Sequence, residues 1–131
     1  MTYLTDFERD VIEKLLDGEH PVLKELRKQL ELCSVRKREM TGVGFYLRLD
    51  VPEKSSCMPS VDLKLGDVDA EIAELKHGAG FVLYIKDGRL DMLEGYSYDE
   101  PWPNNISKYT LKYDTDDQRD WDKLEQTLKM R

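Results

Sequence analysis

An Asp-Gly pair, Asp87-Gly88, separates two apolar runs within residues 80–103. A two-residue Asp-Gly loop is typical of a type I′ turn, in which both residues have positive φ. We therefore predict a β-hairpin with three cross-strand pairs on one face: Ile85 with Leu90, Leu83 with Met92, and Phe81 with Glu94. A three-residue loop would shift this pairing by one residue.

In this register Glu94 is a carboxylate on the packing face of the hairpin. An isolated charge in an apolar environment is costly, so Glu94 must be paired, hydrogen-bonded, protonated or at the sheet edge. A protonated or poised carboxylate is suited to general acid or base catalysis. One functional hypothesis is therefore a small hydrolase or ligand-binding enzyme in which Glu94 is catalytic, assisted by Tyr96 or Tyr98.

The composition indicates a soluble globular protein of one domain, residues 1–131. Charged residues make up 36% and hydrophobic residues 40%, and 20 Lys and Arg against 27 Asp and Glu give a net charge of −7. Binding to nucleic acid or to an anionic membrane depends on clustered cations, so this balance disfavours both. A basic protein partner is favoured instead.

The first residues contain neither a basic segment nor an apolar segment of the kind found in signal peptides. No apolar run approaches the length needed to cross a bilayer. We therefore expect a cytoplasmic protein without membrane association. In that compartment Cys33 and Cys57 are expected to remain thiols rather than form a disulfide.

Helices are predicted at both ends of the chain. Thr5 and Glu8 match a capping box for a helix near residues 6–17, and Pro21 suits the first turn of a second helix. The short link between them predicts a helical hairpin. A second capping box, Thr115 with Gln118, predicts a final helix with the acidic Asp116 and Asp117 at its start and a buried stripe formed by Trp121, Leu124 and Leu128.

The middle of the chain alternates with period two, which predicts strands. Residues 43–51 and 106–113 show this alternation, whereas residues 63–75 fit either a strand or a helix; we favour a strand there because the hairpin follows directly. The sequence therefore predicts an α+β fold with an N-terminal helical hairpin, a mainly antiparallel sheet of about five strands and a C-terminal helix.

Several polar residues could bind a metal ion or act in catalysis, but each has a simpler interpretation. Asp67, Asp69 and Glu71 would point the same way along a strand, yet no calcium-loop pattern surrounds them, so a solvated face is favoured. His20 and His77 have no neighbouring ligands at metal-binding spacing, and we interpret both as structural or surface residues. We expect neither a metal nor a cofactor. Cys57 could act as a nucleophile with His77 only if the fold brought them together.

The basic run Arg36–Arg38 is interpreted as a solvated sheet edge, where charges discourage aggregation between sheets.

Aromatic and acidic residues gather after the hairpin. The predicted binding residues are Tyr96, Tyr98, Asp99, Glu100 and Trp102. Tyrosine and tryptophan often anchor protein interfaces because they join an apolar body to a polar tip. The alternative is that these aromatic residues pack on the core where the strand ends, and we favour this alternative, because buried aromatic residues are common in small domains.

Three segments resemble a known family: Glu39-Met-Thr-Gly-Val-Gly-Phe-Tyr, Gly80-Phe-Val-Leu-Tyr-Ile-Lys-Asp-Gly, and Leu93-Glu-Gly-Tyr-Ser-Tyr followed by Trp102-Pro. They are similar to a family of small, uncharacterised bacterial proteins, some of which resemble immunity proteins of polymorphic toxin systems. The resemblance covers roughly residues 20–113. It implies a bacterial cytoplasmic origin and no known cofactor, and it assigns no role to any residue.

These observations lead to three functional hypotheses. The first is a non-enzymatic cytoplasmic binding domain, immunity-like, that presents an acidic and aromatic surface to a basic protein. The second is the enzyme that uses Glu94. The third is a homodimer built through an exposed sheet edge or aromatic patch.

Overall fold

The chain has an α+β fold, as the sequence predicts, and a computed structural model describes residues 3–52, 61–115 and 118–129. The helices are α1 (Asp6–Leu15), α2 (Pro21–Leu32) and α3 (Trp121–Lys129). The strands are β1 (Ser34–Met40), β2 (Gly44–Asp50), β3 (Leu63–Ile72), β4 (Ala79–Lys86), β5 (Arg89–Ser97) and β6 (Tyr109–Tyr113). All neighbouring strands are antiparallel, and the six-stranded sheet has one strand more than the expected five.

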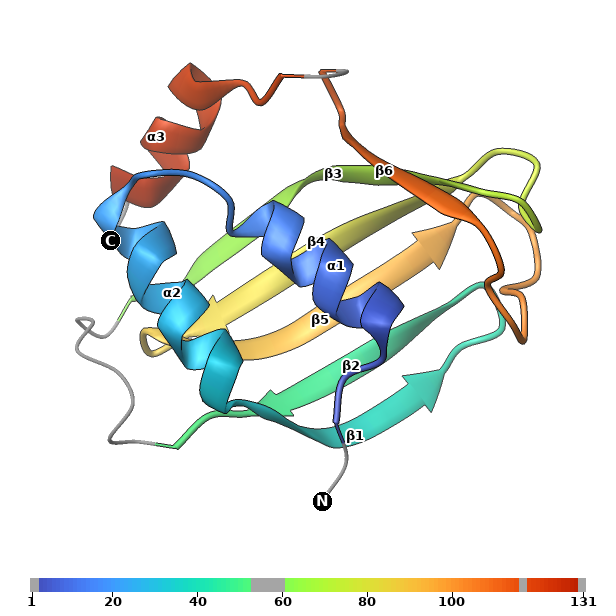
Figure 1. Cartoon of the computed structure of the whole chain (residues 1–131), viewed down its shortest axis with the longest axis horizontal. Coiled ribbons are helices and arrows are strands. Elements are labelled where there is room, and N and C mark those ends of the chain that lie inside the picture. The colour runs from blue at the N-terminus through green and yellow to red at the C-terminus, as the bar shows by residue number, and fades with distance from the viewer. Residues whose placement is uncertain (1–2, 53–60, 116–117, 130–131) are drawn as a thin grey trace.

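The strand order is β1-β2-β5-β4-β3-β6, so β1 and β6 form the two edges. Helices α1 and α2 lie over one face of this sheet, and α3 lies beside the start of β3, before the residues that pair with β6 (Figure 1). Within the described chain no helix covers the centre of the opposite face, which we call the open face. None of the described helices is both long enough and apolar enough to span a membrane.

The two N-terminal helices begin at the residues that the sequence predicts. Thr5 and Glu8 form the capping box, with hydrogen bonds of 2.9 and 3.1 Å between side chain and backbone. Pro21 opens α2, and Nδ1 of His20 accepts a hydrogen bond of 3.1 Å from the N–H of Val22. His20 is thus a helix cap, in agreement with its structural interpretation. Helix α1 ends at Leu15, two residues before the predicted position.

The core lies between the helices and the sheet. Leu47, Leu83 and Leu93 are fully buried on the three central strands, and the ring of Phe7 from α1 packs on Phe81 with the centroids 5.7 Å apart. Burial of each such side chain contributes about 1.5–3 kcal/mol. This packing fixes which residues of each strand face the helices and which face the open side.

The predicted hairpin forms, and its turn is of the predicted kind. Asp87 and Gly88 have φ values of 53° and 76°, as a type I′ turn requires, and Ile85 pairs with Leu90. The register then shifts between Tyr84 and Ile85, because β5 contains one extra residue, Asp91. This β-bulge exchanges the faces of all residues that follow it in β5.

The remaining predicted pairs are therefore wrong. Leu83 pairs with Leu93 and Phe81 pairs with Gly95, whereas Glu94 pairs with Val82 on the open face. The side chain of Glu94 does not lie on the packing face. A period-two alternation counted from the turn assumes that every residue is paired. Because Asp91 is left out of the pairing, this count assigns Glu94 to the packing face, whereas it lies on the open face.

The side chain of Gln29 from α2 holds the turn of this hairpin. Its amide donates to the carbonyl of Gly88 at 2.8 Å and accepts from the N–H of Leu90 at 2.9 Å. Gln29 has no exposed surface, and both contacts join residues about sixty positions apart in the chain. A polar side chain at this buried helix position thus connects α2 to the end of β4 and the start of β5.

A second irregularity in β3 lies beside Asp67, one of the three acidic residues that were expected to point the same way. The register shifts between Leu65 and Val68. The Asp67 carboxylate there accepts two hydrogen bonds from the Arg119 guanidinium, at 2.7 and 3.0 Å. Glu71 pairs instead with Lys112 at 3.1 Å. The shift lies before Val68, so Asp69 and Glu71 keep the expected alternation with the buried Val68, Ala70 and Ile72, whereas Asp67 lies at the irregularity and is held by Arg119.

The start of the last helix also differs from the prediction. Helix α3 begins at Trp121, where the N–H of Lys123 donates to the Asp120 side chain at 3.1 Å, so Asp120 is the cap. The predicted box fails because the Thr115 hydroxyl donates to the carbonyl of Gln118. Two further predictions, on Asp116 and Asp117, lie outside the described residues.

The buried stripe of α3 and the extent of β6 are only partly as expected. Leu124 and Leu128 are buried, whereas Trp121 is 42% exposed. Strand β6 begins at Tyr109 rather than at Ile106. The basic run Arg36–Arg38 lies in the edge strand β1, as expected.

Candidate functional site

The open face carries aromatic and apolar side chains at its centre, although this face looks towards solvent. Strands β2, β4 and β5 contribute half-buried residues to it: Tyr46, Arg48, Val82, Tyr84, Met92, Glu94 and Tyr96. A sheet face that is not packed on the protein's own core is usually more polar than this. The centre of the open face is therefore the first candidate for a binding surface.

Three tyrosines surround the carboxylate of Glu94, and we call these four residues the tyrosine cluster. Tyr46 lies directly opposite Glu94 on β2, where paired Cβ atoms are about 4.5–5.5 Å apart. The hydroxyl of Tyr84 on β4 donates to Oε1 of Glu94 at 2.9 Å. Tyr96 follows Glu94 by two residues on the same face. The cluster thus joins three adjacent strands.

A glycine makes room for one of the rings. A Cβ atom added to Gly80 on β4 would lie 2.5 Å from the hydroxyl oxygen of Tyr96, which shows that the Tyr96 ring crosses this position. Tyr98 packs on Tyr96 edge to face, with the ring centroids 5.7 Å apart. The aromatic surface therefore continues from the cluster to the end of β5.

The pKa values of two hydroxyl groups in the cluster, those of Tyr84 and Tyr96, are raised. Burial raises the pKa of Tyr84, and the hydrogen bond and negative charge of Glu94 raise it further. The pKa of Tyr96 is raised by burial and then by its interactions with Tyr98. Both hydroxyls are consequently hydrogen-bond donors at neutral pH. Within the ranges that the structure describes, no Lys or Arg forms an ion pair with Glu94.

A hollow of about 540 Å³ adjoins the cluster. Tyr84 and Met92 line it from the sheet, Lys64 from β3, and Thr127 from α3. The ammonium nitrogen of Lys64 lies 6.0 Å from the centroid of the Tyr84 ring. The open face therefore combines a flat aromatic centre with a recess towards α3.

The structure separates the five predicted binding residues. Tyr96 and Tyr98 lie together at the open face, and Tyr98 is 46% exposed. Asp99 is exposed in the turn after β5, with φ 65°. Trp102 instead packs on Phe45 on the helix side of the sheet, with ring centroids 5.3 Å apart. The packing interpretation thus holds for Trp102.

Glu100 positions a loop. Its two carboxylate oxygens accept hydrogen bonds from the backbone N–H groups of Lys76 and His77 at 2.7 and 2.8 Å. These bonds lower the pKa of Glu100. The carboxylate therefore fixes the turn between β3 and β4.

The proposed catalytic use of Glu94 depended on a carboxylate enclosed among apolar residues. Glu94 lies on the open face instead, and its hydroxyl partner is Tyr84 rather than Tyr96 or Tyr98. The contact between Glu94 and Tyr84 holds the carboxylate in place. Among the described residues, the hydrogen-bond partner of the Glu94 carboxylate is the Tyr84 hydroxyl.

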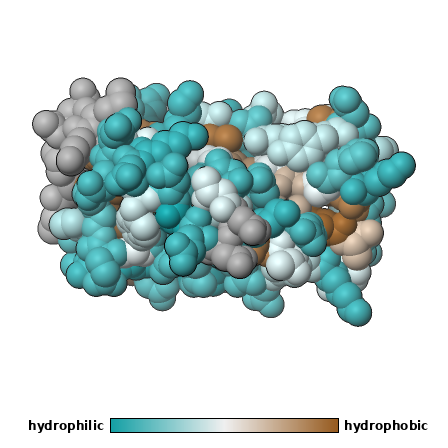
Figure 2. All heavy atoms as spheres, turned by 90° about the horizontal axis from the view of Figure 1, so that it is seen from above, coloured by the Kyte–Doolittle hydropathy of each residue, from teal (hydrophilic) through white to brown (hydrophobic). Residues whose placement is uncertain are grey.

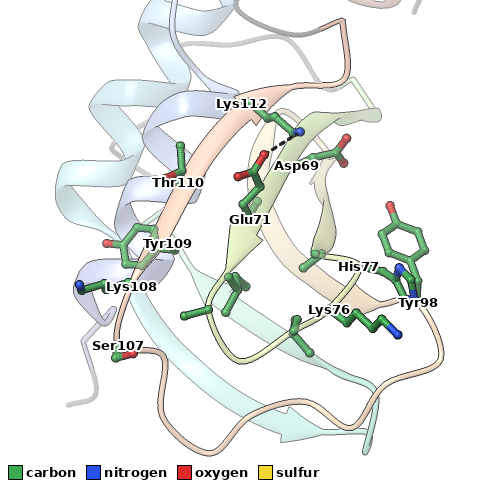
Figure 3. Close-up of a pocket in the computed structure, with 16 residues that line it drawn as sticks. Asp69, Glu71, Lys76, His77, Tyr98, Ser107, Lys108, Tyr109, Thr110 and Lys112 are labelled. Carbon is green, nitrogen blue, oxygen red and sulfur yellow. Dashed lines mark hydrogen bonds and ion pairs between the residues drawn. The ribbon is translucent and has the colours of Figure 1, made fainter.

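A second hollow, of about 960 Å³, lies where β3 ends and β6 begins (Figure 3). Its lining residues do not converge. Tyr109 and Lys108 point to one side of the sheet, whereas Asp69, His77 and Tyr98 lie on the other side (Figure 3). The hydroxyl of Tyr109 bonds to the Asp10 carboxylate on α1. This hollow is therefore a wide depression around the end of the sheet.

The remaining candidate residues do not form a reactive group in the described ranges. His77 lies in the turn that Glu100 holds, and Cys57 lies outside the described residues. Cys33 has a free thiol whose pKa is raised by burial, which disfavours the reactive thiolate. Among residues 3–52, 61–115 and 118–129, no three His, Cys, Asp or Glu side chains are grouped to hold a metal ion.

Comparisons of the chain with models of protein families, with curated proteins and with solved structures find no match.

Sequence reasoning missed Tyr46, Tyr84 and Met92. In residues 43–51, Tyr46 lies between the apolar residues of the alternation, which places its side chain on the other face of β2. This alternation is a signal for an aromatic residue on the outer face of the sheet. The same alternation places Tyr84, between Leu83 and Ile85, on the outer face of the hairpin. Met92 was assigned to the packing face, and the bulge at Asp91 moves it to the open face.

Proposed function

We propose that the protein is a non-enzymatic protein-binding domain and that the open face, centred on the tyrosine cluster, binds the partner. The observation that carries this proposal is the set of half-buried tyrosines and Met92 on a sheet face that no described helix covers at its centre. Tyrosine and methionine are enriched at protein interfaces, and tyrosine is common among the residues that dominate binding energy.

The charge of the chain favours a basic partner. A net charge of −7 accelerates encounter with a positively charged protein and slows encounter with an acidic one. The resemblance to immunity proteins of toxin systems makes a toxin one candidate for this partner, and the cytoplasm the place where they meet.

A homodimer through the sheet edge at β6 has less support. This side of the molecule, seen from above in Figure 2, is mostly hydrophilic, with apolar atoms in small areas. Stable dimers usually bury a larger apolar surface.

Site-specific photo-crosslinking tests the proposal. The photoreactive amino acid p-benzoylphenylalanine replaces Tyr98, which is 46% exposed at the end of the open face, and in a matched variant it replaces Tyr3, which is 70% exposed and precedes α1. Irradiation in the producing cells should crosslink a defined protein to the Tyr98 variant and not to the Tyr3 variant. Equal crosslinking from both positions, or no crosslinked protein from Tyr98, would contradict the proposal.

A further inference from the structure

We infer that the tyrosine cluster is a binding site for a single arginine side chain presented by the protein partner. This inference rests on the proposed function, because it names the chemical group by which the partner is held. It is carried by the arrangement of one carboxylate and three tyrosine rings on adjacent strands.

The first argument concerns the hydrogen bonds of Glu94. Oε1 accepts from the Tyr84 hydroxyl at 2.9 Å, and Oε2 accepts no hydrogen bond from the described residues. The Tyr84 bond orients the carboxylate, so an incoming guanidinium would meet a fixed acceptor. Hydrogen bonds between a guanidinium and a carboxylate are among the strongest in proteins, because both groups are charged and their planar shapes match.

The second argument concerns charge. Two cations lie near the cluster, but neither forms an ion pair with Glu94. Nε of Arg48 lies 3.6 Å from the Glu39 carboxylate, and the ammonium of Lys64 lies over the Tyr84 ring at 6.0 Å. The charge of Glu94 therefore has no ion-pair partner in the described part of the chain. A cation supplied by another protein would complete the site.

The third argument concerns the rings. Tyr46 and Tyr96 flank Glu94, one across the strand pair and one along the strand, and both are half-buried. Tyrosine faces attract cations within about 6 Å, and the position of Lys64 over Tyr84 shows this attraction within the protein itself. Arginine is preferred to lysine because its planar guanidinium stacks on aromatic rings while it also binds a carboxylate.

A peptide pair tests the inference without knowledge of the partner. The probe is the tripeptide acetyl-Gly-Arg-Gly-amide, and its control contains citrulline, a neutral analogue of arginine with nearly the same shape. Each is titrated into the full ¹⁵N-labelled chain, and the backbone amide signals of Tyr46, Tyr84, Glu94 and Tyr96 are followed. The arginine peptide should produce saturable shifts at these signals. The dissociation constant of the citrulline peptide should be at least about five-fold higher.

Two variants locate the site. Glu94→Gln retains the shape of the side chain and an acceptor for Tyr84, and it should weaken arginine binding about five-fold or more. Glu71→Gln makes the same change in net charge on the same face, where Glu71 pairs with Lys112, and it should leave binding unchanged. Equal binding of the two peptides, unchanged binding by Glu94→Gln, or equal weakening by Glu71→Gln would overturn the inference.

These outcomes are distinct from those of the crosslinking experiment. A partner crosslinked at position 98, together with no preference for arginine over citrulline, would leave the proposed function standing and refute the arginine site. Arginine binding that depends on Glu94, without any crosslinked protein, would support the site and refute the protein-binding function.

Discussion

The hydroxyl of Tyr84 donates a 2.9 Å hydrogen bond to Glu94, and this contact exists because β5 leaves Asp91 out of the pairing as a β-bulge. The bulge at Asp91 brings Glu94 to the same face as Tyr84. If the strand instead paired regularly through Asp91, the two side chains would lie on opposite faces of the sheet. The most polar contact at the centre of the open face thus depends on a local irregularity of the backbone.

The titration of Tyr84 tests this contact. The negative charge of Glu94 disfavours the tyrosinate, so Glu94→Gln should lower the pKa of Tyr84. The pKa should remain above its ordinary value of 10.0, because burial is the largest cause of the shift. Tyrosine ¹³Cζ chemical shifts followed against pH report the change. Tyr109, which bonds to Asp10, serves as the control and should titrate as before; an unchanged pKa of Tyr84 would contradict the role of Glu94.

Gln29 should make a large contribution to stability. Gln29→Leu retains an apolar body but removes the donor to Gly88 and the acceptor for Leu90. Loss of a partner by a buried polar group costs about 1–3 kcal/mol, so the free energy of unfolding should fall by roughly 2–4 kcal/mol. Urea denaturation followed by circular dichroism measures this free energy of unfolding. Lys28→Ala, at an exposed position of the same helix, should stay within about 0.5 kcal/mol; a similar loss in both variants would refute the specific role of Gln29.

The pair formed by Arg119 and Asp67 connects α1, β3 and the segment before α3. The Arg119 side chain is 2% exposed and also donates to the carbonyls of Leu15 and Asp17 at the end of α1, at 2.6 and 2.7 Å. Arg119→Met should lower the free energy of unfolding by about 3–5 kcal/mol, because a half-buried carboxylate loses its cation.

A double-mutant cycle isolates this interaction. In the Asp67→Asn background, Arg119→Met should cost less than in the wild type, because the uncompensated charge is already removed. Denaturant unfolding of the four proteins gives the coupling energy. Additive effects of the two substitutions would show that the pair does not act as a unit.

Stability should decrease at alkaline pH. The hydrogen bond to Asp10, and then burial, raise the pKa of Tyr109 to about 12 from 10.0. Between these two values the unfolded chain loses the Tyr109 proton while the folded chain keeps it, so deprotonation favours unfolding. The stabilising contribution is complete below pH 10 and is lost as the pH rises towards 12.

Urea denaturation at a series of pH values from 8 to 12 measures this decrease. Tyr109→Phe should show a smaller decrease above pH 10, because it lacks the ionising hydroxyl. Tyr3→Phe, at a position that is 70% exposed, should follow the wild-type profile. An identical decrease in wild type and Tyr109→Phe would assign the effect to other groups.

The sequence was sufficient for features that depend on neighbouring residues. The turn at Asp87-Gly88 follows from the need for two positive φ values, and the start of α1 follows from the reciprocal bonds of Thr5 and Glu8. Both signals act over a few residues, so no knowledge of the tertiary structure was needed to predict them.

The sequence was insufficient where distant residues decide the local structure. Met92 and Leu93 are both apolar, so their order gives no sign of a bulge; the structure buries Leu93 against the helices, while Gln29 binds the turn from α2. Trp102 could equally have remained exposed, and its contact with Phe45 places it on the helix side. Such assignments depend on contacts between segments far apart in the chain.

The inserted residue at position 91 has a consequence for how this protein tolerates changes of length. Deletion of Asp91 would remove the bulge, yet Leu83 would still lie opposite Leu93 and Val82 opposite Glu94, so the later residues of β5 would keep their faces. A strand that instead paired regularly through Asp91 would carry Glu94 under the helices and expose Leu93 to water. By leaving one residue out of the pairing, the bulge keeps the hydrophobic layer free of charge.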